Sequence, residues 1–173
     1  MVALKSLIFI ILVPGTVTVL VPYVLLTSFG NLLQIDIGHF RYLGGVPFLI
    51  GVPILLWSIW DFTFTGKGTP APVDPPKELV VRGLYRYVRN PMYVGGVFIL
   101  FGEAIFFASL LLFGYTVFIF FCFHMFVIGY EEPTLRRTFG RTYDVYCESV
   151  PRWLPNHFFP PNPVDNTKDL QDK

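Results

Sequence analysis

The sequence is poor in charge. Only 14% of its 173 residues are Asp, Glu, Lys or Arg, against about 25% in ordinary soluble domains. The formal net charge is +1, so composition gives no reason to expect nucleic acid as a partner. Hydrophobic residues make up 53%, which is more than a small soluble domain can bury. We therefore expect an integral membrane protein in which the bilayer covers the remaining apolar surface.

Cysteine is also scarce. The two cysteines, Cys122 and Cys147, fit neither a CxxC motif nor the spacing of a zinc site. Cys122 lies in an apolar run and Cys147 in a polar segment, so we expect both to be unpaired and expect no metal. The C-terminal sequence Asp-Leu-Gln-Asp-Lys contains no lipidation motif, so we expect that the chain is not itself prenylated there.

Long apolar runs are abundant, and they predict an all-α, polytopic transmembrane protein of about four spans. About 20 apolar residues cross a bilayer core, and residues 6–26 and 43–64 each meet this length. The run 92–129 is long enough for two spans, which we expect to form a helical hairpin with its turn near residues 109–114. A signal peptide is the alternative for the first run, but this run is longer than a signal h-region and no small-x-small cleavage site follows it.

These runs divide the chain into four parts. Residues 1–64 form the N-terminal transmembrane helices, and residues 65–90 form a loop followed by a basic juxtamembrane segment. Residues 91–155 contain the hairpin and a polar C-terminal block, and the Pro-, Asn- and Asp-rich tail 156–173 is expected to be disordered. The 65–90 segment carries five basic residues and the 27–42 loop only one. The positive-inside rule therefore predicts that the 65–90 segment and both termini are cytoplasmic.

The first of two motif-rich blocks covers residues 82–96. Arg82, Arg86 and Arg89 are spaced by four and three, which places them on one face of a helix. Such a stripe binds anionic lipid headgroups, or it forms a site for a carboxylate or phosphate. Asn90-Pro91 is typical of a helix start, and a helix N-terminus beside arginines favours an anion.

The second block runs from Glu131 and Glu132 to Pro155. Apolar positions at spacings of four, four and three predict one amphipathic helix over residues 133–147. They are Leu135, Phe139, Tyr143 and Tyr146. The two glutamates either form a solvated helix start or bind a cation or the hydroxyls of a ligand. Both blocks should lie on the same, cytoplasmic face of the membrane.

Glu103 and His124 are ionisable residues inside the hairpin, and such residues are candidates for function. They would lie at comparable depth if the turn were near Phe113, so the alternative is that they satisfy each other. Gly95, one turn after Pro91, allows close approach of either a helix or a ligand.

The two blocks together resemble a known family. Residues 86–95, Arg-Tyr-Val-Arg-Asn-Pro-Met-Tyr-Val-Gly, resemble the Arg-His-Pro-x-Tyr-x-Gly signature of isoprenylcysteine carboxyl methyltransferases and related phospholipid methyltransferases. Residues 131–152 resemble the C-terminal block of the same family, and the resemblance covers about 79–155. Asn90 stands where the family often has His. Because an amide does not titrate near neutral pH, a positional role at a cofactor survives this change and a proton-transfer role does not.

The resemblance implies S-adenosylmethionine as cofactor and a lipid or prenylated acceptor. Its implied cofactor-binding residues are Arg89, Asn90, Pro91, Tyr93, Gly95, Glu131, Glu132 and Trp153. Arg152 is the catalytic candidate for contact with an anionic acceptor group, and Glu103 is the candidate for helping to deprotonate an amine. Carboxyl O-methylation of an isoprenylcysteine, N-methylation of a phospholipid headgroup and methylation of a small thiol or lipid all fit as the acceptor chemistry. A membrane reductase using NADPH and a non-enzymatic protein that binds anionic lipid are the alternatives, and the sequence indicates no oligomeric state.

Overall fold

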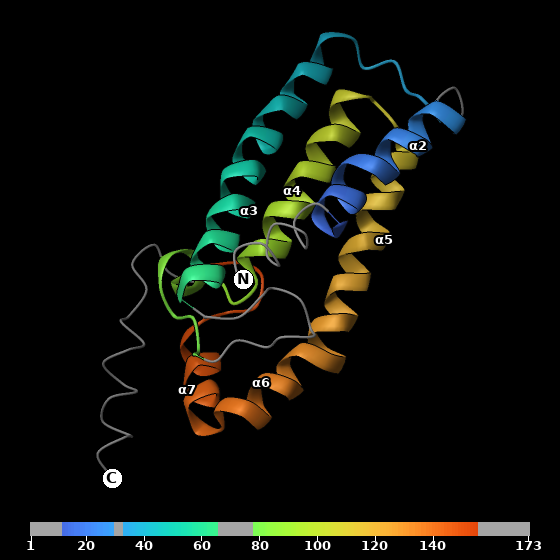
Figure 1. Cartoon of the computed structure of the whole chain (residues 1–173). Helices are drawn as coiled ribbons and strands as arrows, with labels where there is room; N and C mark the ends of the chain where they lie inside the picture. The colour runs from blue at the N-terminus through green and yellow to red at the C-terminus, as the bar shows by residue number, and fades with distance from the viewer. Residues whose placement is uncertain (1–11, 30–32, 66–77, 156–173) are drawn as a thin grey trace.

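We analysed a computed structural model that describes residues 12–29, 33–65 and 78–155. Every regular element in these ranges is helical (Figure 1), which confirms the all-α prediction. The expected disordered tail, the start of the first predicted span and residues 66–77 of the predicted loop lie outside the described residues.

Four helical segments run side by side (Figure 1). The first consists of the π-helical turn η1 (Thr16–Leu20) followed by α2 (Val21–Phe29), and the second of the 3-10 helix η2 (Gly38–Gly44) followed by α3 (Gly45–Thr65). The third and fourth are α4 (Pro91–Phe106) and α5 (Leu110–Phe126). Helix α4 packs most extensively against α3 and also packs against α5, while α2 contacts α5. The predicted hairpin of residues 92–129 is therefore present as α4 and α5.

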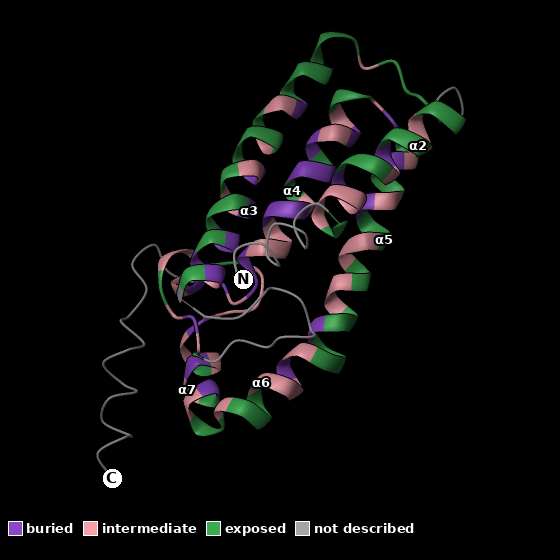
Figure 2. Ribbon diagram, in the orientation of Figure 1, coloured by how far each residue is buried: buried purple, intermediate pink, exposed green. Residues whose placement is uncertain are grey.

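Two of these segments are long and apolar enough to cross a membrane by length and composition. They are Gly38–Phe64, with a mean hydropathy of 1.8, and Leu110–Phe139, with a mean hydropathy of 2.3; Thr16–Phe29 and Pro91–Phe106 are apolar but shorter. Large apolar side chains on α3 and α5 point outward, among them Leu49, Trp60, Phe118 and Met125, and exposed residues recur along the whole length of both helices (Figure 2). Neither long helix is thus the buried core of a soluble protein.

Glycines bring α3 and α4 together. A Cβ atom at Gly95 would lie 2.6 Å from the backbone nitrogen of Leu55, and one at Gly102 would lie 2.7 Å from the backbone nitrogen of Phe48. Gly51 and Gly44 face Gly95 and Gly102 in turn. Small residues at a spacing of seven on both helices thus allow their backbones to approach closely, as membrane helices commonly do.

The hairpin turns earlier than the sequence predicts. Helix α4 ends at Phe106, and α5 begins at Leu110 because Ser109 caps it, with the Ser109 side chain accepting a hydrogen bond from the backbone of Leu112 at 3.3 Å. Phe113, the expected turn residue, lies inside α5.

The expected match in depth between Glu103 and His124 is therefore wrong. Glu103 lies three residues before the end of α4, close to the turn, whereas His124 lies near the opposite end of α5.

The C-terminal block forms two helices instead of one. After the π-helical turn η4 (Val127–Glu131), α6 (Glu132–Phe139) and α7 (Arg141–Ser149) are separated by Gly140. The backbone φ of Gly140 is +54°, a left-handed conformation that ends a helix and that glycine adopts easily. The predicted apolar face is nevertheless confirmed, because Tyr143 and Tyr146 are buried in a cluster that also contains Leu135 and Phe139.

The basic segment before α4 is not an α-helix. It contains only the short 3-10 helix η3 (Gly83–Arg86), and the φ of Gly83 is +56°. The three arginines therefore do not form one stripe, and the predicted common face is wrong. Arg82 pairs with Asp61 near the end of α3 at 3.3 Å, whereas Arg89 points to the C-terminal block.

Candidate functional site

The two motif-rich blocks meet at one end of the bundle, where α3 ends and α4 begins next to α6 and α7 (Figure 1). The backbone N–H of Arg89 donates to the carbonyl oxygen of Pro151 at 2.9 Å. The side-chain amide of Asn90 donates to the carbonyl oxygen of Arg152 at 3.2 Å. These bonds tie the segment before α4 to the segment after α7, so residues 62 positions apart build one site.

Asn90 takes the expected position but uses its side chain differently. It is the N-cap residue of α4, with Pro91 in the first turn, yet its side chain makes no capping hydrogen bond. The amide instead holds the C-terminal segment. An amide donates this bond without titrating near neutral pH, and a role of Asn90 at a cofactor stays a prediction.

Glu132 lies at the centre of the site. Its carboxylate accepts two hydrogen bonds from the guanidinium of Arg152, at 2.7 Å and 3.0 Å, and Nη1 of Arg89 lies 3.2 Å from the same carboxylate. The side chains of Glu132 and Arg89 are only 11% and 12% exposed. Donation to Glu132 raises the pKa of Arg152 above its usual value. Two cations thus share one buried anion, and an excess positive charge remains.

Glu131 points to a different partner. Its carboxylate accepts a hydrogen bond from the hydroxyl of Tyr93 on α4 at 2.9 Å. The Tyr93 ring packs against Phe123 of α5, with 4.7 Å between ring centroids. The two adjacent glutamates therefore make different contacts. Glu132 links Arg152 of the C-terminal segment to Arg89, and Glu131 links η4 to α4.

Trp153 closes the site on the side of α5. Its indole Nε1–H donates to Nδ1 of His124 at 3.1 Å, and its ring packs against Phe120 with 5.2 Å between centroids. The segment after α7 is therefore held at three successive residues. Arg89 and Asn90, just before α4, bind Pro151 and Arg152, and His124 of α5 binds Trp153.

A polar cleft opens beside the ion pairs. It has a volume of about 590 Å³ and is lined by Arg89, Glu132, Arg136, Arg141, Asp144, Val145, Cys147, Glu148 and Arg152. A much smaller cavity of about 30 Å³, room for about one water molecule, lies among Tyr85, Asn90, Glu131 and neighbouring residues. Arg89 and Glu132 line both, so their ion pair lies between the open cleft and the small cavity.

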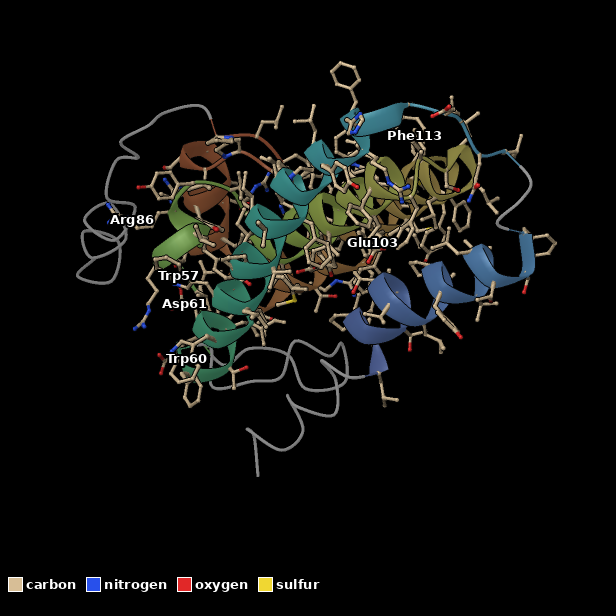
Figure 3. All side chains as sticks on the ribbon, turned by 90° about the horizontal axis from the view of Figure 1, so that it is seen from above. Trp57, Trp60, Asp61, Arg86, Glu103 and Phe113 are labelled. Atoms are coloured by element: carbon tan, nitrogen blue, oxygen red, sulfur yellow. The ribbon has the colours of Figure 1, made fainter. Side chains whose placement is uncertain are left out.

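Two predicted site residues lie elsewhere. Gly95 packs against the backbone of α3. Glu103 lies thirteen residues after Asn90, and a helix rise of about 1.5 Å per residue places it about 20 Å along α4. Figure 3 shows Glu103 far from Asp61 and Arg86 at the other end of the bundle. Glu103 lines an apolar groove of about 500 Å³ with Gly102, Phe106 and residues of α3. The other predicted residues come together: Arg89, Asn90, Pro91, Tyr93, Glu131, Glu132, Arg152 and Trp153.

The structure also adds residues that sequence reasoning missed. The Sγ atom of Cys147 accepts a hydrogen bond from Arg89 at 2.7 Å. Cys147 follows Tyr143 by four residues, so the sequence pattern could have placed it on the same face of the helix. Tyr146 donates to the carbonyl oxygen of Tyr85 at 2.7 Å. Burial raises the pKa of the Tyr146 phenol, so the hydroxyl keeps the proton of this bond. The carboxylate of Asp61, buried at the end of an apolar span, was visible in the sequence as an isolated charge.

One of three comparisons with known proteins gives a match. A search of curated proteins and a search of solved structures each give no match. Residues 40–142, more than half of the chain, match the family described as phospholipid methyltransferase. This range extends from η2 into α7 and includes the ion pair of Arg89 with Glu132. The chain therefore belongs to the phospholipid methyltransferase family, whose members are membrane proteins that methylate lipid-like substrates.

Proposed function

We propose that this protein uses S-adenosylmethionine to methylate a lipid acceptor at the membrane surface. The observation that carries the proposal is the buried cluster of Glu132, Arg89 and Arg152, which the fold assembles from the two blocks of family-like sequence. S-adenosylmethionine supplies an activated methyl group on a sulfonium and also carries a carboxylate, an ammonium and ribose hydroxyls. A site for it must therefore offer both signs of charge.

The residues present fit such a cofactor. Nε of Arg89 is buried and has no hydrogen-bond partner within the described residues, so Arg89 has a donor to give to a carboxylate. Glu131 and Glu132 offer carboxylate oxygens for an ammonium or for hydroxyls. Tyr93 and Trp153 offer aromatic faces, which favour a planar ring or a cation. The open cleft next to Arg89 provides the room.

We further propose that the chain crosses the membrane four times, with this site at the cytoplasmic surface. The four helical segments η1–α2, η2–α3, α4 and α5 lie side by side (Figure 1), and each of them exposes large apolar side chains. The described arginines of the 65–90 segment (Arg82, Arg86 and Arg89) and those of the C-terminal block belong to the end that carries the site. The positive-inside bias places that end in the cytoplasm.

The chain's own residues contribute mainly by holding and orienting. Methyl transfer is an in-line displacement, and alignment of the reacting atoms with exclusion of water lowers much of its barrier. The bonds of Asn90, Arg152 and Trp153 fix the C-terminal segment against α4 and α5. A carboxylate acceptor needs no general base. For an amine acceptor, Glu131 is the nearer carboxylate, because Glu103 lies about 20 Å from Asn90 along α4.

Calorimetry on the purified protein in nanodiscs tests the cofactor. We expect saturable binding of S-adenosylmethionine and no binding of NADPH. The double variant Glu131→Gln/Glu132→Gln should lose this binding, whereas Glu103→Gln should keep it. Binding of NADPH alone would assign the chain to the reductase alternative. Binding of neither cofactor to folded protein would overturn the methyltransferase proposal.

A further inference from the structure

His124 has an unusual pair of neighbours for a residue on a lipid-facing helix. It lies near the end of α5 and forms a cluster of three rings with Phe120, 6.2 Å away, and Trp153, 5.9 Å away, which also contact each other. Trp153 belongs to the segment after α7, next to Arg152, whose guanidinium holds Glu132. His124 and Phe120 therefore join α5 to the segment that carries Arg152, and His124 makes the hydrogen bond of this contact.

The hydrogen bond from Trp153 determines where the imidazole carries its proton. An indole N–H can only donate, so Nδ1 of His124, at 3.1 Å, must accept. A neutral imidazole with a lone pair on Nδ1 carries its hydrogen on Nε2. His124 is thus a donor at Nε2, and this nitrogen points away from Trp153 because the two ring nitrogens diverge.

The donor at Nε2 has no protein acceptor in the part of the chain that the structure describes. The neighbouring positions Phe121 and Met125 are 58% and 68% exposed and present an apolar surface. A polar N–H beside hydrocarbon costs free energy unless an acceptor reaches it. An amphiphile that brings an oxygen to this position would satisfy the donor next to Trp153, the residue that follows Arg152.

We propose that Nε2–H of His124 binds an anionic oxygen of the lipid acceptor, and that Trp153 is the positioning residue that holds His124 in this tautomer. The inference rests on the proposed function. A phospholipid phosphate and the carboxylate of a prenylated cysteine share this chemistry. Hydrogen bonds to charged oxygens are stronger than neutral ones, so His124 contributes to acceptor affinity and not to cofactor affinity.

Nitrogen NMR of the full chain in nanodiscs tests the tautomer without any need for activity. With ¹⁵N-labelled histidine, the resonances of His124 are assigned by their loss in His124→Asn. We expect the wild type to show an unprotonated Nδ1 and a protonated Nε2. Trp153→Phe keeps an aromatic ring but removes the donor, so it should give a mixture of tautomers. A protonated Nδ1 in the wild type would overturn the proposal, and it would leave the cofactor proposal untouched.

Acceptor binding and kinetics test the role of Nε2. Phosphatidylethanolamine and an S-farnesylated cysteine are titrated separately, and the acceptor that supplies the oxygen should shift the Nε2 resonance. His124→Asn keeps a group near the Nδ1 position but cannot reach the Nε2 position, whereas the longer amide of His124→Gln can. We expect His124→Asn to raise the KM for that acceptor at least about tenfold, with a smaller rise in His124→Gln and unchanged binding of S-adenosylmethionine in both. If neither acceptor shifts the resonance and both variants keep wild-type KM values, His124 does not bind the acceptor.

Discussion

The hydroxyl of Tyr146 on α7 donates a hydrogen bond to the backbone carbonyl oxygen of Tyr85 at 2.7 Å. This buried bond joins the C-terminal block to the segment before α4. Two residues 61 positions apart in the sequence thus hold together the walls of the candidate site.

Tyr146→Phe should destabilise the protein by about 1–3 kcal/mol, because it leaves a buried carbonyl group without its donor. Urea unfolding in detergent, followed by tryptophan fluorescence, measures the change. Tyr87 is 38% exposed, so Tyr87→Phe is the matched control and should change stability by less than about 0.5 kcal/mol. Equal effects of the two substitutions would show that the Tyr146 bond does not hold the blocks together.

Gly95→Ala should destabilise the packing of α3 on α4, because the new Cβ would lie 2.6 Å from the backbone nitrogen of Leu55. Overpacking of this kind costs about 1–3 kcal/mol. At Gly96 no atom of the described residues outside its own helix turn lies within 4 Å of the added Cβ, so Gly96→Ala should be neutral or slightly stabilising through its helix propensity. Thermal unfolding of the two adjacent variants gives the comparison, and a more stable Gly95→Ala variant would contradict the close approach of the helices.

Glu132→Gln should remove the only carboxylate that Arg89 and Arg152 are seen to pair with in the described residues. The largely buried Arg89 and the partly exposed Arg152 would then lack a counter-charge, and the expected loss of stability is about 3 kcal/mol. The exposed pair of Arg136 and Asp144 provides the comparison, because Asp144→Asn should cost less than about 1 kcal/mol. Denaturant titration of both variants at low and high salt tests this; a loss at Glu132 no larger than that at Asp144 would refute the central role of Glu132.

Glu103→Gln should leave methyl transfer within about twofold of the wild type, because Glu103 lies far along α4 from the ion-pair cluster. One of its carboxylate oxygens is buried and has no hydrogen-bond partner among the described residues, so the neutral amide should not reduce stability. Initial rates and an unfolding curve on the same sample measure both effects. A large fall in kcat with intact cofactor binding would instead support the catalytic role that the sequence suggests for Glu103.

The sequence predicted well what depends on local pattern. Apolar run length gave α3 and the α4–α5 hairpin, and apolar periodicity gave the buried face of Tyr143 and Tyr146. It failed where a single residue interrupts a pattern. Gly140 divides the predicted C-terminal helix, and the cap at Ser109 moves the hairpin turn, which separates Glu103 from His124.

The candidate site itself was only partly predictable. Motif resemblance selected Arg89, Glu131, Glu132 and Arg152, but no spacing rule says which carboxylate meets which arginine. The spacing in the sequence also predicted Arg89 and Arg82 on one helix face. In the structure Arg82 pairs with Asp61, whereas Arg89 pairs with Glu132.

The amino-acid sequence by itself determined that this is a helical membrane protein with two polar blocks, because burial of apolar length and the need to satisfy backbone groups in lipid allow little else. Only the tertiary structure decided that Glu132 pairs with Arg89 and Arg152, that Glu131 faces Tyr93, and that Trp153 fixes the proton of His124. These pairings depend on the direction in which each segment enters and leaves the bundle. That direction is set by the close contact of glycines on α3 and α4 and by the turns at Ser109 and Gly140, which bring side chains distant in sequence within hydrogen-bonding distance.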